Sequence, residues 1–345
     1  MRLLVCGGAG FIGSAFVRRM LSTRDDVEIT CFDKLTYAGN LDNLEPVAGD
    51  PRYRFVLGDI CDREAVEAAI AATPGGPPDA IVNFAAETHV DRSIAGPEAF
   101  LKTDVLGTHT LLEAVRAHAI SRMVQVSTDE VYGSADPGVS FCETDRFRPS
   151  SPYSASKAAG DLQALAYHAT YATPVCVTRG SNTYGSHQYP EKLIPLFVTN
   201  ALEGAQLPLY GDGMNVRDWM HVDDHCDGIA AVLDRGRPGE VYNLGGGNER
   251  TNREITTIIL DELGLEWDEA VRHVADRPGH DRRYSISCAK AAEELGWKPH
   301  VDFESGLRET VRWYRDNEWW WRKIKHHTGE FAEWKARWYD GAGRS

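Results

Sequence analysis

A glycine-rich turn near the start of the chain stands between an apolar run and a helical pattern. Residues 7–13 read Gly-Gly-Ala-Gly-Phe-Ile-Gly and directly follow the run Arg2–Cys6. Glycine suits this place because the turn is tight, the backbone must approach a pyrophosphate closely, and the next helix offers free N–H groups to that anion. The pattern therefore predicts a dinucleotide-binding Rossmann-type domain with contacts from Gly7, Gly10, Phe11, Ile12 and Gly13.

The first half of the chain alternates short apolar runs with amphipathic stretches, which indicates βαβ units wound into a parallel sheet. We predict an α/β fold: a doubly wound parallel sheet over residues 1–180, with a return segment near 218–244. Residues 181–345 should form mainly a smaller, non-contiguous substrate-binding cap, with a C-terminal helix that carries six tryptophans packed on it. The predicted strands are Arg2–Cys6, Glu28–Asp33, Tyr53–Leu57, Ala80–Phe84, Arg122–Ser127, Pro174–Arg179 and Glu240–Leu244, and the predicted helices are Gly10–Ser22, Arg63–Ala72, Pro97–Ala119 and Ser154–Thr173.

Charge and cysteine content exclude several classes of partner. The 345 residues carry a formal net charge of −14, which argues against nucleic acid and anionic membranes. The seven cysteines include no CxxC pair, so they predict neither a disulfide framework nor a metal site. No apolar run approaches the ~18 residues of a membrane span, and the N-terminal residues enter a strand without an apolar signal region. We expect a cytoplasmic protein.

An acid at the end of the second strand bears on the choice of cofactor. Asp33 lies 20 residues beyond Gly13, where a carboxylate accepts hydrogen bonds from the adenine-ribose hydroxyls and repels a 2′-phosphate. This favours NAD over NADP, although the neighbouring Lys34 could accommodate NADP. Asp59, after the third strand, could meet the adenine edge or serve as a plain helix N-cap.

Tyr153 and Lys157 form a Tyr-x-x-x-Lys pattern at the start of a predicted helix, which places phenol and ammonium one turn apart on the same face. A tyrosine near its reference pKa of ~10 is a poor base at neutral pH, and a nearby lysine favours the phenolate. The fifth strand leads into Thr128, Asp129 and Glu130. Adjacent acids are usually solvated surface charge, but here they follow the strand that should deliver a hydroxyl toward Tyr153. We expect these five residues to be catalytic.

Taken together, these motifs resemble those of the dTDP-glucose 4,6-dehydratases, a family of extended short-chain dehydrogenases/reductases. The matching segments are GGAGFIGS, DKLTYAGN, AAETHVDRSI, STDEVYG, SPYSASKA, YPEKLIPLF, LPLYGDGMNVRDWMHVDDH, TNRE and ADRPGHDRRY. The resemblance implies an NAD-dependent lyase that converts dTDP-glucose to dTDP-4-keto-6-deoxyglucose. It implies that Tyr153 takes the C4 hydroxyl proton, Thr128 bonds that hydroxyl, Glu130 is the base at C5 and Asp129 the acid at C6.

The resemblance also supplies further binding residues. Arg217 and Arg282 are our candidates for the diphosphate, because a guanidinium fork matches phosphate oxygens. His89, Glu191 and His280 could equally be structural. The remaining expected cofactor contacts are Leu35, Thr36, Ile60, Ala85 and Ala86, and the remaining substrate contacts are Thr88, Asn182, Lys192, Leu193, Pro208, Leu209, Tyr210, Asn252 and Tyr284.

The sequence departs from the family pattern after the sixth strand. Gly180 stands where relatives commonly have cysteine, and Thr183 stands where they have a second asparagine that contacts the nicotinamide amide.

Alternative functions are a UDP-hexose 4-epimerase, a dehydratase of another nucleotide sugar, or a catalytically silent dinucleotide-binding protein; the Asp129-Glu130 pair argues against the epimerase. The Pro97–Ala119 and Ser154–Thr173 helices could pair in a homodimer, as the resemblance implies, or pack only on the sheet.

Overall fold

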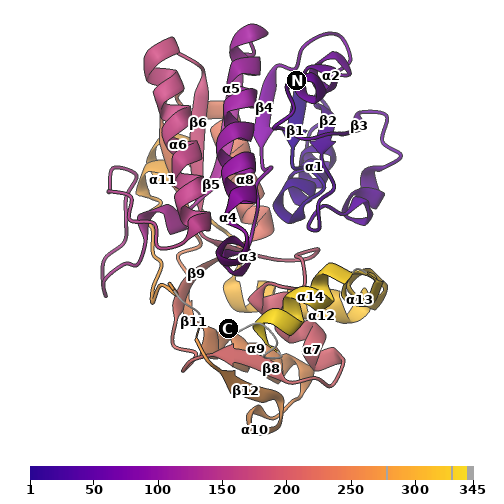
Figure 1. Cartoon of the computed structure of the whole chain (residues 1–345), viewed down its shortest axis with the longest axis vertical. Helices are drawn as coiled ribbons and strands as arrows, with labels where there is room; N and C mark the ends of the chain where they lie inside the picture. Colours follow the sequence, from indigo (N-terminus) through magenta and orange to yellow (C-terminus); the bar gives the residue numbers. More distant parts are fainter. Residues whose placement is uncertain (277–278, 328, 340–345) are drawn as a thin grey trace.

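A seven-stranded parallel sheet forms the larger part of the molecule. The computed structural model describes residues 1–276, 279–327 and 329–339. Figure 1 shows this sheet and its helices above a smaller lobe. The strand order is β10-β6-β5-β4-β1-β2-β3. The strands are β1 Arg2–Cys6, β2 Glu28–Asp33, β3 Tyr53–Leu57, β4 Ala80–Asn83, β5 Arg122–Thr128, β6 Val175–Gly180 and β10 Val241–Leu244.

This order confirms the predicted doubly wound sheet, including the return of the chain to it as a seventh strand. The winding direction reverses between β1 and β4, so the carboxyl ends of these two strands open the crevice in which such sheets bind ligands. Apolar side chains fill both faces of the sheet. One face is covered by α1 Phe11–Thr23 and α8 Val222–Arg235, and the other by α2 Arg63–Ala71, α5 Thr108–Ala117 and α6 Pro152–Tyr171.

The helix predicted at Pro97–Ala119 is present from Pro97 to Ala117, but it is not α-helical throughout. The chain forms α3 Val90–Ala95, α4 Pro97–Phe100, a π-helical segment η2 Leu101–Gly107 and then α5. The wide π turn packs tightly on α6: a Cβ added at Gly160 would lie 2.8 Å from the Asp104 carbonyl oxygen. Such a turn arises from packing between helices, so the periodicity of one segment does not reveal it.

The smaller lobe consists of two short sheets and several helices. A three-stranded sheet has the order β11 Glu249–Thr251, β9 Val216–His221, β7 Asn182–Tyr184, and β8 Leu207–Tyr210 pairs with β12 Val271–Val274. Helices α7 Leu193–Leu202, α9 Asn252–Leu263 and α12 Phe303–Asp316 enclose a second apolar core. The remaining elements are η1 Leu41–Val47, η3 Asp129–Tyr132, α10 Trp267–Ala270, α11 Ala289–Leu295, α13 Glu318–His327 and α14 Gly329–Trp338.

The tryptophan-rich C-terminal helices pack on this lobe, as predicted, and also reach the larger one. Trp321 is fully buried and Trp334 nearly so, whereas Trp319 is 59% exposed. The indole N–H of Trp320 donates to Oδ1 of Asn43 over 2.9 Å, across 277 residues of sequence. This contact ties the end of the chain to the loop after β2. Of the helices in the described ranges, none is both long and apolar enough to cross a membrane.

Candidate active site

The glycine turn forms a cradle at the amino end of α1. Gly7 has a φ of +74°, and a Cβ at Gly13 would collide with the Gly7 carbonyl oxygen, so neither position accepts a side chain without a backbone shift. Gly10 is the N-cap of α1 and provides no side-chain cap. The first backbone N–H groups of this helix are therefore left for an anion, which fits the pyrophosphate of a dinucleotide.

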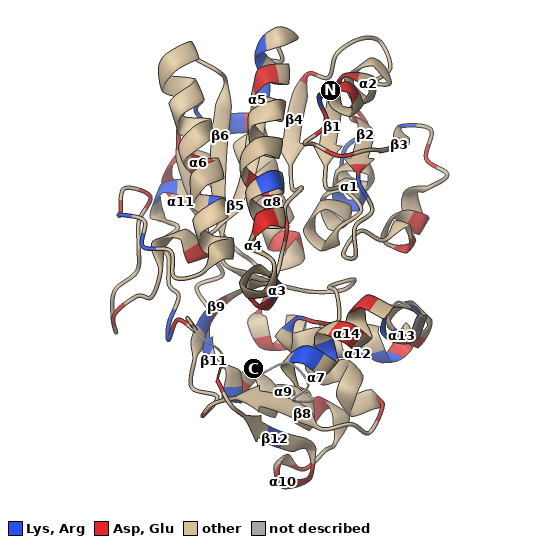
Figure 2. Ribbon diagram, viewed as in Figure 1, with Lys and Arg blue, Asp and Glu red and all other residues tan. Residues whose placement is uncertain are grey.

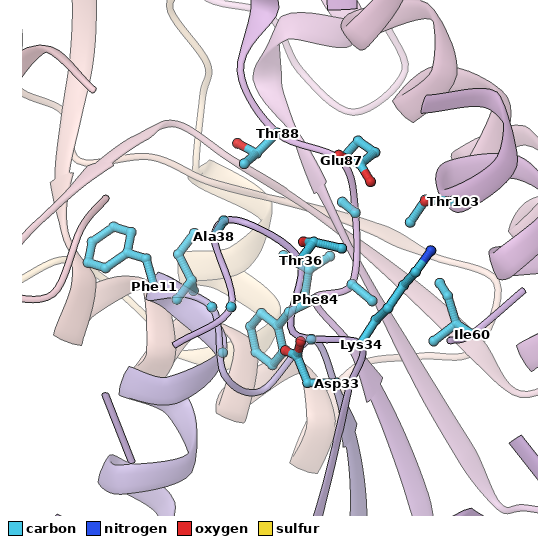
Figure 3. Close-up of a pocket in the computed structure, with 18 of the residues that line it drawn as sticks. Phe11, Asp33, Lys34, Thr36, Ala38, Ile60, Phe84, Glu87, Thr88 and Thr103 are labelled. Atoms are coloured by element: carbon cyan, nitrogen blue, oxygen red, sulfur yellow. The ribbon is translucent and has the colours of Figure 1, made fainter. Parts of the chain in front are cut away.

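Asp33 closes the cradle at the end of β2. Its carboxylate accepts hydrogen bonds from the backbone N–H groups of Ala9 (2.9 Å) and Leu35 (2.8 Å). Burial raises the pKa of Asp33, and these N–H groups partly offset that rise. Figure 3 shows Phe11 on one side of this view, Lys34 on the other, and Asp33 and Thr36 between them. The fixed carboxylate is suited to accept the hydroxyls of a ribose.

Lys34 forms an ion pair with Asp59 over 2.7 Å. Its ammonium is thereby engaged by a carboxylate at the end of β3, which leaves it less able to bind a 2′-phosphate. The Asp59 carboxylate also accepts from the backbone N–H of Cys61. Asp59 therefore lines the pocket and also stabilises the turn at residues 59–61 through this hydrogen bond.

The pocket brings together nearly all the predicted cofactor residues. Leu35 is the exception: it lies outside the lining, and its backbone N–H bonds Asp33. Other lining residues were not predicted, namely Phe32, Ala38, Gly39, Gly58, Phe84, Glu87, Thr103, Val126, Ser127, Gln188 and Tyr189.

Tyr153 and Lys157 project from the first turns of α6. A capping box of Ser151 and Ser154 fixes the start of this helix, and Pro152 occupies its first position. Nζ of Lys157 donates to the carbonyl oxygen of Val126 over 2.9 Å, which ties the helix to β5. Both residues line the cofactor pocket, and Tyr153 also lines the second pocket, described below.

Burial, and next the charge of Glu130, raise the pKa of Tyr153 well above its usual value. A phenol in such a site acts as a base only when positive charge stands beside it. Lys157, which lies one helical turn away and is buried, provides such a charge.

Thr128, Asp129 and Glu130 lie where β5 passes into η3. Thr128 is the N-cap of η3: its hydroxyl oxygen accepts from the Glu130 N–H over 3.2 Å, and the hydroxyl contacts Oδ1 of Asp129 at 3.2 Å. Asp129 is buried, and that burial, together with the charges of Glu130 and Asp218, raises its pKa well above the usual range. Glu130 lines the second pocket. The two neighbouring acids therefore meet different environments.

The second pocket lies beyond Tyr153, between the large sheet and the smaller lobe. Arg217 on β9 is 5% exposed, and its guanidinium lies 4.3 Å from the ring centre of Tyr284. The predicted substrate residues in its lining are His89, Asn182, Glu191, Lys192, Leu193, Pro208, Leu209, Tyr210, Arg217, Asn252 and His280, and the predicted catalytic residue Glu130 lies among them. Residues that the sequence analysis did not single out are Val90, Asp91, Leu196, Phe197, Trp219 and Tyr339.

Four predicted substrate residues lie outside this lining. Thr88 faces the cofactor pocket, where its hydroxyl accepts from Lys192 over 3.0 Å. Thr128 and Tyr284 are buried, and the Tyr284 hydroxyl lies 3.5 Å from Oε2 of Glu130. Arg282 is 57% exposed and forms a bidentate pair with Asp212. A guanidinium suits phosphate, which is why Arg282 was predicted to bind the diphosphate. The sequence does not show that Asp212 already pairs with it.

Glu191 is held between two side chains. Arg92 pairs with its Oε2 over 2.8 Å, and the Tyr37 hydroxyl donates to its Oε1 over 2.9 Å. The Arg92 guanidinium also lies over the Tyr37 ring. His280 is braced in a similar way by Asp276, at 2.5 Å. Both residues reach the substrate pocket while their side chains hold loops together.

The departures at positions 180 and 183 are linked by one buried histidine. A Cβ at Gly180 would lie 2.5 Å from the imidazole of His225, so glycine makes room for the ring. Nδ1 of His225 lies 2.8 Å from Oγ1 of Thr183, and burial lowers the pKa of His225 to about 4. The carbonyl of Thr183 accepts from Gln188, which lines the cofactor pocket. The backbone of Thr183 thus contacts a residue of this pocket, whereas its hydroxyl contacts His225.

The end of α14 closes one side of the substrate pocket. Tyr339 stacks on Tyr210 with ring centres 5.5 Å apart and planes 27° apart, and Trp334 meets the ring of His89 edge-on. Tyr339 belongs to the pocket lining. No motif near the C-terminus signalled this role, because it depends on the path of α13 and α14 back across the molecule.

A dinucleotide cradle, a Tyr-x-x-x-Lys pair beside it and an adjoining second pocket define a short-chain dehydrogenase/reductase of the extended class. The family model described as GDP-mannose 4,6 dehydratase matches residues 4–310. The dTDP-glucose 4,6-dehydratase of Streptomyces antibioticus is 55% identical over 94% of this chain and 96% of its own length. The enzyme of that name from Shigella flexneri is 46% identical over 99% of both chains.

Solved structures give the same result. The dTDP-glucose 4,6-dehydratase DesIV of Streptomyces venezuelae, solved with NAD and a second ligand bound, has a TM-score of 0.90 and 57% identity, and the match covers 94% of this chain and 100% of that one. A UDP-glucose 4-epimerase of Thermus thermophilus, in complex with NAD, has a TM-score of 0.84 at 32% identity, with 92% and 100% covered. This chain belongs to the dTDP-glucose 4,6-dehydratase family.

Proposed function

We propose that the protein is an NAD-dependent lyase that converts dTDP-glucose to dTDP-4-keto-6-deoxyglucose. The observation that carries this proposal is the pair of adjacent acids at the end of β5. Asp129 is buried, and Glu130 lines the substrate pocket together with Tyr153. An epimerase that only oxidises and reduces C4 has no need of an acid for C6. The family to which the chain belongs supports the same activity.

The cradle fits NAD, which when bound accepts the C4 hydride, later returns it to C6 and places a positive ring beside Tyr153. Tyr153, aided by Lys157, takes the proton of the C4 hydroxyl, and Thr128 bonds that oxygen. The 4-ketone acidifies C5–H, so Glu130 can remove that proton. Burial and the charge of Glu130 raise the pKa of Asp129, which favours its protonated form and suits it to give a proton to the departing C6 hydroxyl. Glu130 then reprotonates C5.

We infer that Arg217, rather than Arg282, binds the diphosphate, since only Arg217 lines the pocket. Pro208, Leu209 and Tyr210 on β8, with Tyr339 stacked on Tyr210, would hold the nucleobase. Asn182, Lys192 and Asn252 offer polar groups to the sugar and phosphates. The ion pair of Lys34 with Asp59 supports NAD over NADP, because this lysine is then less able to bind a 2′-phosphate.

The activity is tested by incubating the purified protein separately with dTDP-glucose, UDP-glucose and GDP-mannose, and following each by mass spectrometry. We expect dTDP-glucose to lose one water, with no net reduced cofactor, and the other two to react far more slowly. Isomerisation without loss of water would support the epimerase. Bound NAD without turnover on any of the three would support a silent dinucleotide-binding protein.

We also propose a homodimer in the cytoplasm. Much of α6 carries no charge (Figure 2), and four large apolar side chains are exposed on η2 and α6, namely Leu101, Leu106, Leu162 and Tyr171. A face of this kind suits a second copy of the chain. Sedimentation equilibrium should show a dimer that Leu162→Glu dissociates, whereas Leu265→Glu, at an exposed site in the smaller lobe, should leave it intact. A monomeric wild-type protein at micromolar concentration would rule the dimer out.

A further inference from the structure

A chain of polar contacts leads from Glu130 to the surface of the protein. The hydroxyl of Tyr284 lies 3.5 Å from Oε2 of Glu130 and 2.7 Å from Oδ2 of Asp281. The hydroxyl of Ser150 donates to the same oxygen of Asp281. Tyr284 is 4% exposed, Asp281 is half-buried and Ser150 is exposed. These contacts connect a group in the substrate pocket with solvent through one phenol and one carboxylate.

The direction of these bonds follows from the chemistry of a phenol. Tyr284 has a single hydroxyl hydrogen, and the shorter of its two contacts is with Asp281. A lone pair of its oxygen is then available to Glu130, which can donate to it once Glu130 is protonated. Catalytic hydrogen bonds are commonly long before substrate binds and shorten in the complex. The 3.5 Å contact is of that kind.

The segment that carries these groups is fastened to β9. The carbonyl oxygen of Asp281 accepts from Nη2 of Arg217 (2.9 Å) and Nδ2 of Asn215 (3.2 Å). The backbone N–H of Tyr284 donates to the carbonyl of Val216 over 3.2 Å. The arginine that we assign to the diphosphate therefore also sets the position of Asp281.

We propose that Tyr284 and Asp281 form a proton relay that connects Glu130 with solvent during dehydration. This inference rests on the proposed function. When the C5–H bond breaks, its electron pair forms the C5–C6 double bond as the C6–O bond breaks, and the proton passes to Glu130. Glu130 gives this proton to the Tyr284 oxygen as the phenolic proton passes to Asp281 and on to water. The reverse sequence delivers a solvent proton to Glu130 before C5 is reprotonated.

The electrostatics suit a group that passes protons without holding charge. Burial, and then the negative charge of Glu130, raise the pKa of Tyr284 well above its usual value, while Arg217 works in the opposite direction. The phenol is neutral before and after each transfer. Without the relay, the proton taken from C5 remains on Glu130 and returns to the same carbon.

The relay is tested by the origin of the hydrogen at C5. Ordinary dTDP-glucose is converted in heavy water, stopped at low conversion, and the product is read by NMR at C5. We expect the wild-type product to carry mostly deuterium there, and Asp281→Asn and Tyr284→Phe to raise the fraction of protium several-fold. Asp212→Asn is the matched control, because Asp212 is exposed, pairs with Arg282 and should not alter the isotope content.

The isotope content is read from any product formed, so a slow variant still gives an answer. A wild-type isotope content in both relay variants would overturn the relay, and so would a wild-type product that carries only protium at C5. Failure of the wild-type protein to dehydrate dTDP-glucose would overturn the proposed function instead. Melting temperatures near that of the wild type would show that the variants are folded.

Discussion

The hydroxyl of Thr128 lies 3.2 Å from Oδ1 of Asp129, and Asp129 is buried beside the more accessible Glu130. Two adjacent carboxyl groups are thereby kept in unlike surroundings. Close acids that meet different environments separate in pKa, so one can remain protonated while the other is ionised. This separation provides an acid and a base for one elimination.

Asp129→Asn should slow the loss of water while leaving oxidation at C4 largely intact. Asparagine keeps the size and the hydrogen bonding of a neutral Asp129 but cannot release a proton, so we expect kcat to fall by roughly 10²–10⁴. Rapid mixing with dTDP-glucose should show reduced cofactor accumulating by absorbance. Tyr153→Phe is the comparison, because it should suppress the first oxidation as well. Equal loss of that absorbance signal in both variants would contradict these separate roles.

Asp104→Asn should stabilise the protein at neutral and alkaline pH. Burial raises the pKa of Asp104 to about 6, with Lys157 working in the opposite direction, while Ser156 donates to its Oδ2. A raised carboxyl pKa gives stability that is present below the unfolded value near 4 and is lost as pH rises through about 6. The variant should gain up to about 3 kcal/mol at pH 8 and nearly nothing at pH 4. Urea unfolding at both pH values checks this, and an equal gain at both would contradict it.

Asp161→Asn should destabilise the fold strongly. Asp161 on α6 pairs with Arg179 on β6 over 2.9 Å, and both side chains are at most 2% exposed. Removing one partner of such a buried pair typically costs about 3–5 kcal/mol. The control is Arg237→Gln, because Arg237 pairs with Glu294 at the surface, where solvent screens the pair and its loss should change stability little. Equal midpoints of urea unfolding for the two variants would contradict the account.

Tyr339→Ala should weaken the binding of dTDP. The ring of Tyr339 lies against Tyr210 in the pocket lining, so its loss removes one wall of the site that we assign to the nucleobase. An aromatic contact of this kind is worth about 0.5–1.5 kcal/mol beyond its buried area, which corresponds to up to about a tenfold rise in Kd. Titration calorimetry with dTDP measures the change. Tyr339→Phe keeps the ring and should bind as the wild type does, and a loss in both variants would argue against stacking.

The cofactor pocket was largely predictable because its parts are local in sequence. The turn around Gly10 and the acid Asp33 each follow a strand directly, and parallel strands deliver their carboxyl ends to one edge of the sheet. The placement of Tyr153 relative to Lys157 was predictable for a similar reason, because the geometry of one helix sets it. For the same reason all seven strands of the large sheet lie within a residue or two of their predicted bounds.

The substrate pocket was less predictable because it is assembled from segments that meet only in the folded chain. Arg217 and Arg282 looked alike in sequence, yet Asp212 holds only the second of them at the surface. Tyr339 enters the pocket through the packing of α14, and the π turn at Leu101–Gly107 follows from contact with α6. Such outcomes depend on partners that periodicity and motif spacing do not specify.

The most direct test of the account is the fate of the hydrogen at C4. The purified protein is incubated with dTDP-glucose that carries deuterium at C4, without added cofactor, and the product is examined by mass spectrometry and NMR. The account predicts a product that has lost one water and carries the deuterium at C6. Deuterium that remains at C4 in a hexose of unchanged mass would contradict it, and inversion of the configuration at C4 in that hexose would indicate an epimerase.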